Sequence, residues 1–158
     1  MRVACDAAGL VVHQLVMEEH ITKIYSTFET LLTVRPDDID MNQHVHSSRY
    51  QDYVLAARYD QMARCYGMSM DEFVQLGFGW FVNTSHMEYK RPLRLGDQCR
   101  VRTHVENFSR TGVRIGFEIL RCSDGKISCQ GWCDYTLITL SSGRAAEIPA
   151  WIGEKYSV

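Results

Sequence analysis

The chain has 158 residues and a formal net charge of −2, with 46% hydrophobic and 23% charged residues. This balance is typical of one soluble globular domain, and a chain of this length buries about 70% of its unfolded surface in a core. Since no basic stripe dominates, a nucleic-acid partner is not expected. The six cysteines include no C-x-x-C pair and several stand in apolar runs, so we predict free thiols in a reducing, cytoplasmic setting.

Residues 1–25 are predicted to form an N-terminal arm, separate from a single domain over residues 26–158. The apolar patch in this arm is short and is interrupted by Asp6 and His13. It is therefore too short for a transmembrane helix, and with one Arg it makes a poor signal peptide. We expect no membrane partner.

The domain begins with one predicted strand and one long predicted helix. Alternating residues from Phe28 to Val34 indicate a strand that ends at Pro36. A polar loop follows, and residues 47–68 then carry apolar side chains on nearly every face, which is typical of a helix that is buried on most sides. Ser47 or Ser48 can cap its start, and Gly67 can end it.

The rest of the chain predicts a short helix and an antiparallel meander. Ser69 and Glu72 have the spacing of a capping box. Four β-patterned segments follow, at residues 80–92, 98–106, 111–120 and 126–140, separated by turn sequences that favour hairpins. Because the long helix is the only large apolar element able to cover such a sheet, we predict an α+β fold in which a curved antiparallel sheet wraps around it.

The polar loop contains the candidate chemistry. Asp40, Asn42 and His44 stand at alternate positions, so an extended loop would point all three side chains the same way. The helix start that follows offers unpaired backbone N–H groups, which can hold an oxyanion while a carboxylate attacks or activates water. Turn formation or helix capping is the simpler interpretation of these residues. Asp40, His44 and His46 could also bind a metal, but their spacing is not that of a zinc helix, and we expect neither a metal nor a cofactor.

The segment "DIDMNQHVHSSRYQDYV" resembles the hotdog-fold thioesterases of the 4-hydroxybenzoyl-CoA thioesterase-like superfamily. Its "DMNQHV" is similar to the D-x-N-x-H-V-N-N-x-x-Y pattern of fatty acyl-ACP thioesterases, and "YKRPLRLGD" resembles the family's strand and turn after the helix. The resemblance covers about residues 26–140. It implies a hotdog fold and hydrolysis of acyl-CoA or acyl-ACP.

The resemblance also implies roles for individual residues. Asp40 matches the catalytic carboxylate, as general base or nucleophile, while Asn42 and His44 match its polar partners. The backbone N–H groups of His46 and Ser47 match the oxyanion site at the helix start. The family pattern has Asn-Asn where this chain has His46 and Ser47. The chain also holds one hotdog unit where acyl-ACP enzymes hold two, so we expect a homodimer or homotetramer with sites between protomers.

Two further sets of residues are candidates for binding the substrate. The residues expected to line the acyl pocket, for which plain core packing is the alternative, are Tyr50, Tyr53, Val54, Ala57, Phe78, Trp80 and Phe81. The cations available for the CoA phosphates are Lys90, Arg91, Arg110 and Arg114. Two other functions stay open, namely a hotdog dehydratase or hydratase and a non-catalytic acyl-CoA-binding protein.

Overall fold

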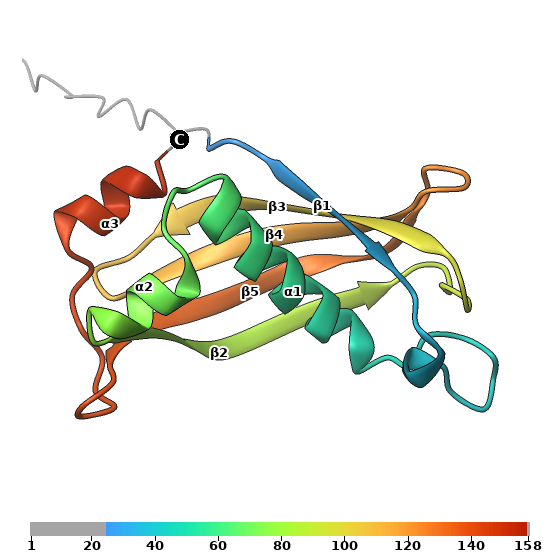
Figure 1. Cartoon of the computed structure of the whole chain (residues 1–158), viewed down its shortest axis with the longest axis horizontal. Coiled ribbons are helices and arrows are strands. Elements are labelled where there is room, and N and C mark those ends of the chain that lie inside the picture. The colour runs from blue at the N-terminus through green and yellow to red at the C-terminus, as the bar shows by residue number, and fades with distance from the viewer. Residues whose placement is uncertain (1–24, 158) are drawn as a thin grey trace, which may run out of the picture.

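The computed structural model describes residues 25–157, and these form a five-stranded antiparallel sheet with helices packed on it (Figure 1). The predicted α+β class and the antiparallel sheet are confirmed. The predicted arm, residues 1–25, lies outside the described part of the chain except for its last residue. The strands, in the spatial order β1-β3-β4-β5-β2, are β1 (Phe28–Thr33), β3 (Gln98–Phe108), β4 (Gly112–Arg121), β5 (Ile127–Thr139) and β2 (Phe78–Tyr89).

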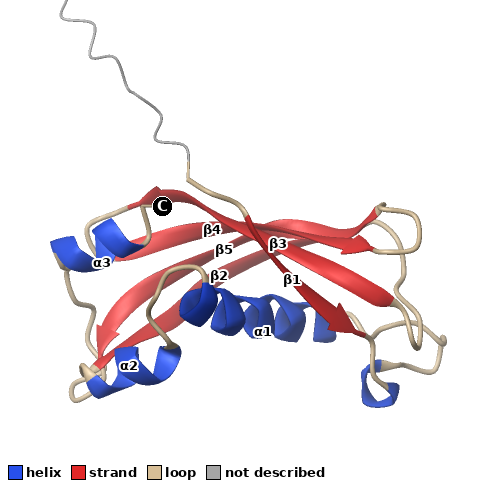
Figure 2. Cartoon of the chain, turned by 45° about the horizontal axis from the view of Figure 1, so that its top comes forward, coloured by secondary structure: helices blue, strands red, loops and turns tan. Residues whose placement is uncertain are grey.

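Helix α1 (Arg49–Arg64) runs along one face of the sheet, as Figure 2 shows. It is shorter than the predicted helix over residues 47–68, and Gly67 adopts a positive φ of 62° three residues after its end. Its side chains Val54, Ala57 and Met62 are buried against the alternating apolar residues of the strands. This apolar burial is what holds the helix on the sheet.

Two short helices close one end of the sheet (Figure 1). Helix α2 (Met70–Gln75) has the predicted capping box, in which Ser69 Oγ accepts the Glu72 N–H and Glu72 Oε2 accepts the Ser69 N–H. Helix α3 (Ala150–Lys155) belongs to the C-terminal segment, whose Tyr156 ring packs 4.6 Å from that of Tyr66, centroid to centroid. None of the helices described here is long and apolar enough to cross a membrane.

Candidate active site

The loop between β1 and α1 carries two carboxylates with different environments. Asp38 ends the short 3₁₀ helix η1 (Pro36–Asp38) and is only 1% exposed. Its Oδ2 accepts hydrogen bonds from the Arg35 N–H at 3.0 Å and from the Tyr53 hydroxyl at 2.7 Å. Burial by itself raises the pKa of Asp38, but the hydrogen bonds from Arg35 and Tyr53 outweigh it and hold that pKa below its usual value. Asp38 is therefore an ionised anchor between the loop and α1.

Asp40 belongs to a tight turn, which corrects the expectation of an extended loop. The Asp40 N–H donates to the His44 carbonyl at 2.8 Å, and Gln43 takes a positive φ of 62° to close the turn. Asp40 Oδ1 accepts the backbone N–H groups of Asn42 at 2.8 Å and His44 at 3.3 Å. The Asn42 side-chain amide contacts Oδ2 at 3.5 Å. Asn42 and His44 therefore surround Asp40 mainly through their backbone.

These contacts determine the charge of Asp40. Desolvation raises the pKa of Asp40, but the hydrogen bonds from Asn42 and His44 lower it by more than that. The pKa of Asp40 therefore lies below its ordinary value. The carboxylate is thus ionised at neutral pH. In this form it can accept a proton from water or attack an electrophilic carbon.

The start of α1 offers one free donor rather than two. The His46 N–H donates to the Asp38 carbonyl at 2.8 Å, so the expectation that this N–H is unpaired is wrong. Within residues 25–157, the Ser47 N–H has no acceptor. The Ser48 N–H donates to His46 Nδ1 at 3.2 Å, and the Tyr89 hydroxyl donates to the Ser47 carbonyl at 3.1 Å. The chain before α1 is thereby fixed from two sides.

Asp40 and Ser47 line the same cleft, which has a volume of about 330 Å³. Its other walls come from the end of β2 and the turn after it. Lys90 and Arg91, two of the four predicted CoA-binding cations, lie on this cleft, where Lys90 pairs with Glu88 at 2.5 Å. The remaining side chains that line it are His44, Val45, His46, Tyr50, Tyr89 and Pro92.

The other two predicted cations lie away from this cleft. Arg110 pairs with Glu147, and Arg114 makes a two-pronged ion pair with Asp134, with N–O distances of 2.7 and 2.8 Å. Asp134 raises the pKa of Arg114, so this charge is already satisfied within the chain. The described chain does not bring either Arg to the Asp40 cleft.

The predicted acyl-pocket residues divide among several environments. Tyr50 lines the Asp40 cleft, whereas Tyr53, Val54 and Ala57 are buried in the core. Phe81 is 58% exposed on β2. Phe78 and Trp80 pack on Phe73. Their ring centroids lie 6.2 Å and 5.6 Å, respectively, from the centroid of the Phe73 ring.

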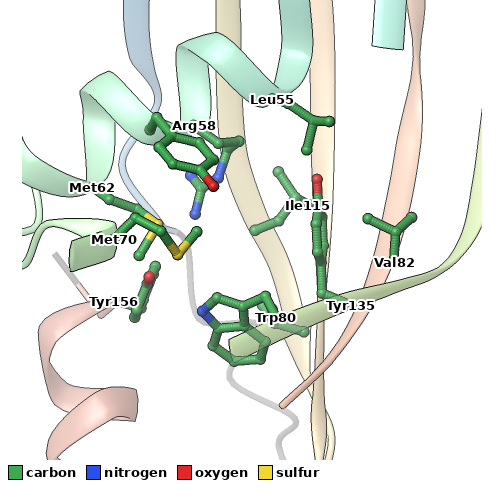
Figure 3. Close-up of a pocket in the computed structure, with 11 residues that line it drawn as sticks. Leu55, Arg58, Met62, Met70, Trp80, Val82, Ile115, Tyr135 and Tyr156 are labelled. Carbon is green, nitrogen blue, oxygen red and sulfur yellow. The ribbon is translucent and has the colours of Figure 1, made fainter. Parts of the chain in front are cut away.

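A second cavity of about 150 Å³ lies between α1 and the start of β2 (Figure 3). Of the predicted pocket residues, only Trp80 lines it. Sequence analysis missed the buried Arg58 in its wall. The sequence feature that could have indicated it is a basic residue within a helix that is apolar on nearly every face.

The part of the chain described here places no group of three or more His, Cys, Asp or Glu side chains where they could hold a metal ion.

Comparisons with known proteins agree with this architecture. A family model described as "Thioesterase-like superfamily" matches residues 34–156. The chain is similar to the structure of a DHNA-CoA thioesterase from Staphylococcus aureus, with 21% identity, coverage of 83% of this chain and 89% of that one, and a TM-score of 0.76. It is also similar to a hypothetical protein from Staphylococcus aureus in complex with CoA, with 20% identity, 84% and 82% coverage, and a TM-score of 0.73.

A third similar structure is a probable thioesterase from Escherichia coli, with 20% identity, 82% and 96% coverage, and a TM-score of 0.71. At these identities, the structural likeness supports the fold alone. No curated protein sequence matches the chain.

Proposed function

The chain belongs to the thioesterase-like superfamily, and we propose that it hydrolyses an acyl thioester of the acyl-CoA or acyl-ACP type in the Asp40 cleft. One observation carries this proposal: the ionised Asp40 carboxylate and the unpaired backbone N–H of Ser47, at a helix start, lie on the same cleft. Acyl transfer needs both: a group that delivers the attacking oxygen and a donor that stabilises the resulting oxyanion.

The reaction proceeds by one of two routes that use the same residues. In the first, Asp40 removes a proton from water while the water oxygen attacks the thioester carbonyl. In the second, Asp40 attacks the carbonyl itself to give a mixed anhydride, which water then hydrolyses. In both routes the Ser47 N–H holds the oxyanion, and collapse of the tetrahedral intermediate breaks the C–S bond and releases the thiolate.

Asn42 and His44 act as positioning residues in this proposal. Their backbone N–H groups fix Asp40 Oδ1, and the Asn42 amide fixes Oδ2. This leaves the carboxylate with a defined orientation in the cleft. His46 holds the Ser48 N–H through Nδ1 and so shapes the helix start, instead of donating its own N–H to substrate.

A CoA handle is favoured over a carrier protein by two observations. Lys90 and Arg91 line the Asp40 cleft and can meet the phosphates of a nucleotide-bearing thiol. One of the similar structures was solved in complex with CoA. Since Arg110 and Arg114 lie away from this cleft, Lys90 and Arg91 are the better candidates.

We further propose that two copies of the chain join through β2. This strand is one edge of the sheet, and its residues Thr84, Ser85 and His86 are exposed in the single chain. The opposite edge, β1, is half as long, and the Arg64 guanidinium covers it by donating to the Glu29 carbonyl at 2.7 Å. An open edge strand favours pairing with an identical strand, and two-fold pairing is the commonest symmetry of such assemblies.

A thiol-release assay tests the proposed function. The purified protein is offered a panel of short, long and aromatic acyl-CoAs, and free CoA is detected with a thiol reagent. We expect release above the uncatalysed rate for at least one member. Hydration of an enoyl-CoA without thiol release would instead support the lyase alternative.

A further inference from the structure

The second cavity combines apolar walls with one buried cation. Arg58 is 7% exposed, and its guanidinium is turned toward the space beside Met62 and Met70 (Figure 3). Leu55, Trp80 and other apolar side chains form the remaining walls. A charged group in such surroundings is unfavourable unless another group compensates it.

The contacts of Arg58 within the described chain contain no carboxylate. Its Nη1 donates to Thr103 Oγ1 at 3.2 Å and to Tyr66 Oη at 3.4 Å, and its guanidinium lies 5.2 Å from the centroid of the Tyr66 ring. Thr103 in turn donates to the side chain of Gln61. These neutral contacts orient the guanidinium but supply no negative charge, and within residues 25–157 no acid pairs with it.

The hydroxyls of two buried tyrosines on the same cavity are poorly satisfied. Tyr156 is 2% exposed and Tyr135 is 8% exposed. Trp80 lies beside the Tyr156 hydroxyl and Cys133 beside the Tyr135 hydroxyl, but within the described chain neither neighbour reaches hydrogen-bond geometry. Burial raises the pKa of Tyr156 to about 12, although the Arg58 charge and the neighbouring Trp80 oppose the rise. The hydroxyl therefore keeps its proton at neutral pH and can donate it. Unpaired buried polar groups are rare in folded proteins, so a cluster of them around a cavity indicates a ligand that supplies acceptors.

We propose that this cavity binds the far end of an acyl group that carries a carboxylate, with Arg58 and Tyr156 as its specificity-determining residues. This inference rests on the proposed thioesterase function, whose substrate class it names. A carboxylate supplies both the missing negative charge and acceptors for the guanidinium and the hydroxyl. The volume of about 150 Å³ is close to that of an engineered cavity that holds benzene, so the carboxylate-bearing end of a short acyl chain fits.

The proposed dimer explains how one substrate reaches both sites. Within one chain, Trp80 and Val82 face the second cavity at the start of β2, whereas Tyr89 faces the Asp40 cleft at its end. In an antiparallel pair of identical strands, the start of one strand lies beside the end of the other. The second cavity of one copy then lies next to the Asp40 cleft of the neighbouring copy. An acyl chain can therefore extend from the cleft of one protomer into the cavity of the other.

The test compares thioesters that differ only in the terminal group. We would measure kcat/KM for adipoyl-CoA and hexanoyl-CoA with the wild-type protein, Arg58→Met, Tyr156→Phe, and Arg64→Met as an exposed control on the same helix. We expect the wild type and Arg64→Met to prefer adipoyl-CoA by about 10- to 100-fold, the range of one hydrogen-bonded charge. Arg58→Met should bring kcat/KM for adipoyl-CoA to the same value as that for hexanoyl-CoA and so abolish this preference, and Tyr156→Phe should reduce it.

A binding measurement separates this inference from the proposed function. Isothermal titration of adipate and hexanoate into the same variants needs no turnover. If no acyl-CoA is hydrolysed but adipate binds to the wild type and not to Arg58→Met, the proposed function fails while the carboxylate site stands. If acyl-CoAs are hydrolysed with equal preference and adipate does not bind, the inference is overturned and the function stands. Loss of stability in Arg58→Met with no change in selectivity or adipate binding would likewise overturn it, because Arg58 would then serve packing alone.

Discussion

The Tyr53 hydroxyl donates a hydrogen bond of 2.7 Å to Oδ2 of Asp38 and so ties the second turn of α1 to the loop that carries Asp40. Both groups are buried, and a hydrogen bond to a buried charge typically contributes about 1.5–3 kcal/mol. We expect Tyr53→Phe to lower the free energy of unfolding by that amount in urea denaturation. Tyr59→Phe, on the exposed face of the same helix, is the control and should leave it unchanged. Equal stability of the two variants would contradict the anchoring role.

Asp38 also predicts how stability depends on pH. Its pKa in the folded protein is below the ordinary value of about 3.9, so the folded state holds its proton less readily than the unfolded state. The resulting stabilisation is fully present above that ordinary value and is lost as the pH falls through the lower folded pKa. The difference in unfolding free energy between the wild type and Asp38→Asn should therefore stay constant from neutral pH to about pH 5 and shrink below about pH 4. A difference that does not change with pH would be inconsistent with this account.

The sequence predicted the fold well because its patterns are local. The alternation along Val101, Thr103 and Val105, for example, is the same pattern that the structure buries in β3. The capping box of α2 could likewise be read directly from Ser69 and Glu72. Each of these signals depends on periodicity or on neighbours within a few residues, and these are properties that a single sequence contains.

The site was predicted less completely because it depends on contacts between distant residues. Asp38 and Asp40 look equivalent in the sequence, and only the packing of Tyr53 shows which of them is the buried anchor. The His46 N–H was expected to be free, but the return of the loop brings the Asp38 carbonyl within 2.8 Å of it. Arg58 was overlooked because its neighbour Thr103 is 45 residues away and on a different element.

The Ser47 N–H can be removed by one substitution. We expect Ser47→Pro to lower kcat for thioester hydrolysis by about 100-fold, because loss of one oxyanion donor has an effect of this size in acyl-transfer enzymes. Ser47→Ala keeps the N–H and removes only a hydroxyl, so it should retain the wild-type rate. Circular dichroism would establish that both variants keep the helix. If a folded Ser47→Pro variant hydrolyses thioesters normally, this N–H is not the oxyanion donor.

The proposed β2 interface can be tested by placing a charge at each edge of the sheet. Phe81 on β2 and Leu31 on β1 are similarly exposed, at 58% and 57%. We expect Phe81→Lys to convert a dimer into a monomer, because a buried lysine on a pairing edge is unfavourable, whereas Leu31→Lys should not. Sedimentation velocity gives the mass of each variant. A dimer that survives Phe81→Lys and dissociates with Leu31→Lys would place the interface on β1 instead.

The role of Asp40 is tested most directly by thiol release from the preferred acyl-CoA in Asp40→Asn, with Asp37→Asn as the control from the same loop. Asp37 is exposed, and within residues 25–157 its carboxylate pairs with Arg35 alone, so its replacement should leave kcat/KM unchanged. Asp40→Asn keeps the shape of the side chain but can neither accept a proton nor attack a carbonyl, and we expect a loss of about 100-fold or more with an unchanged unfolding midpoint. A correctly folded Asp40→Asn variant that releases thiol at the wild-type rate would contradict the account.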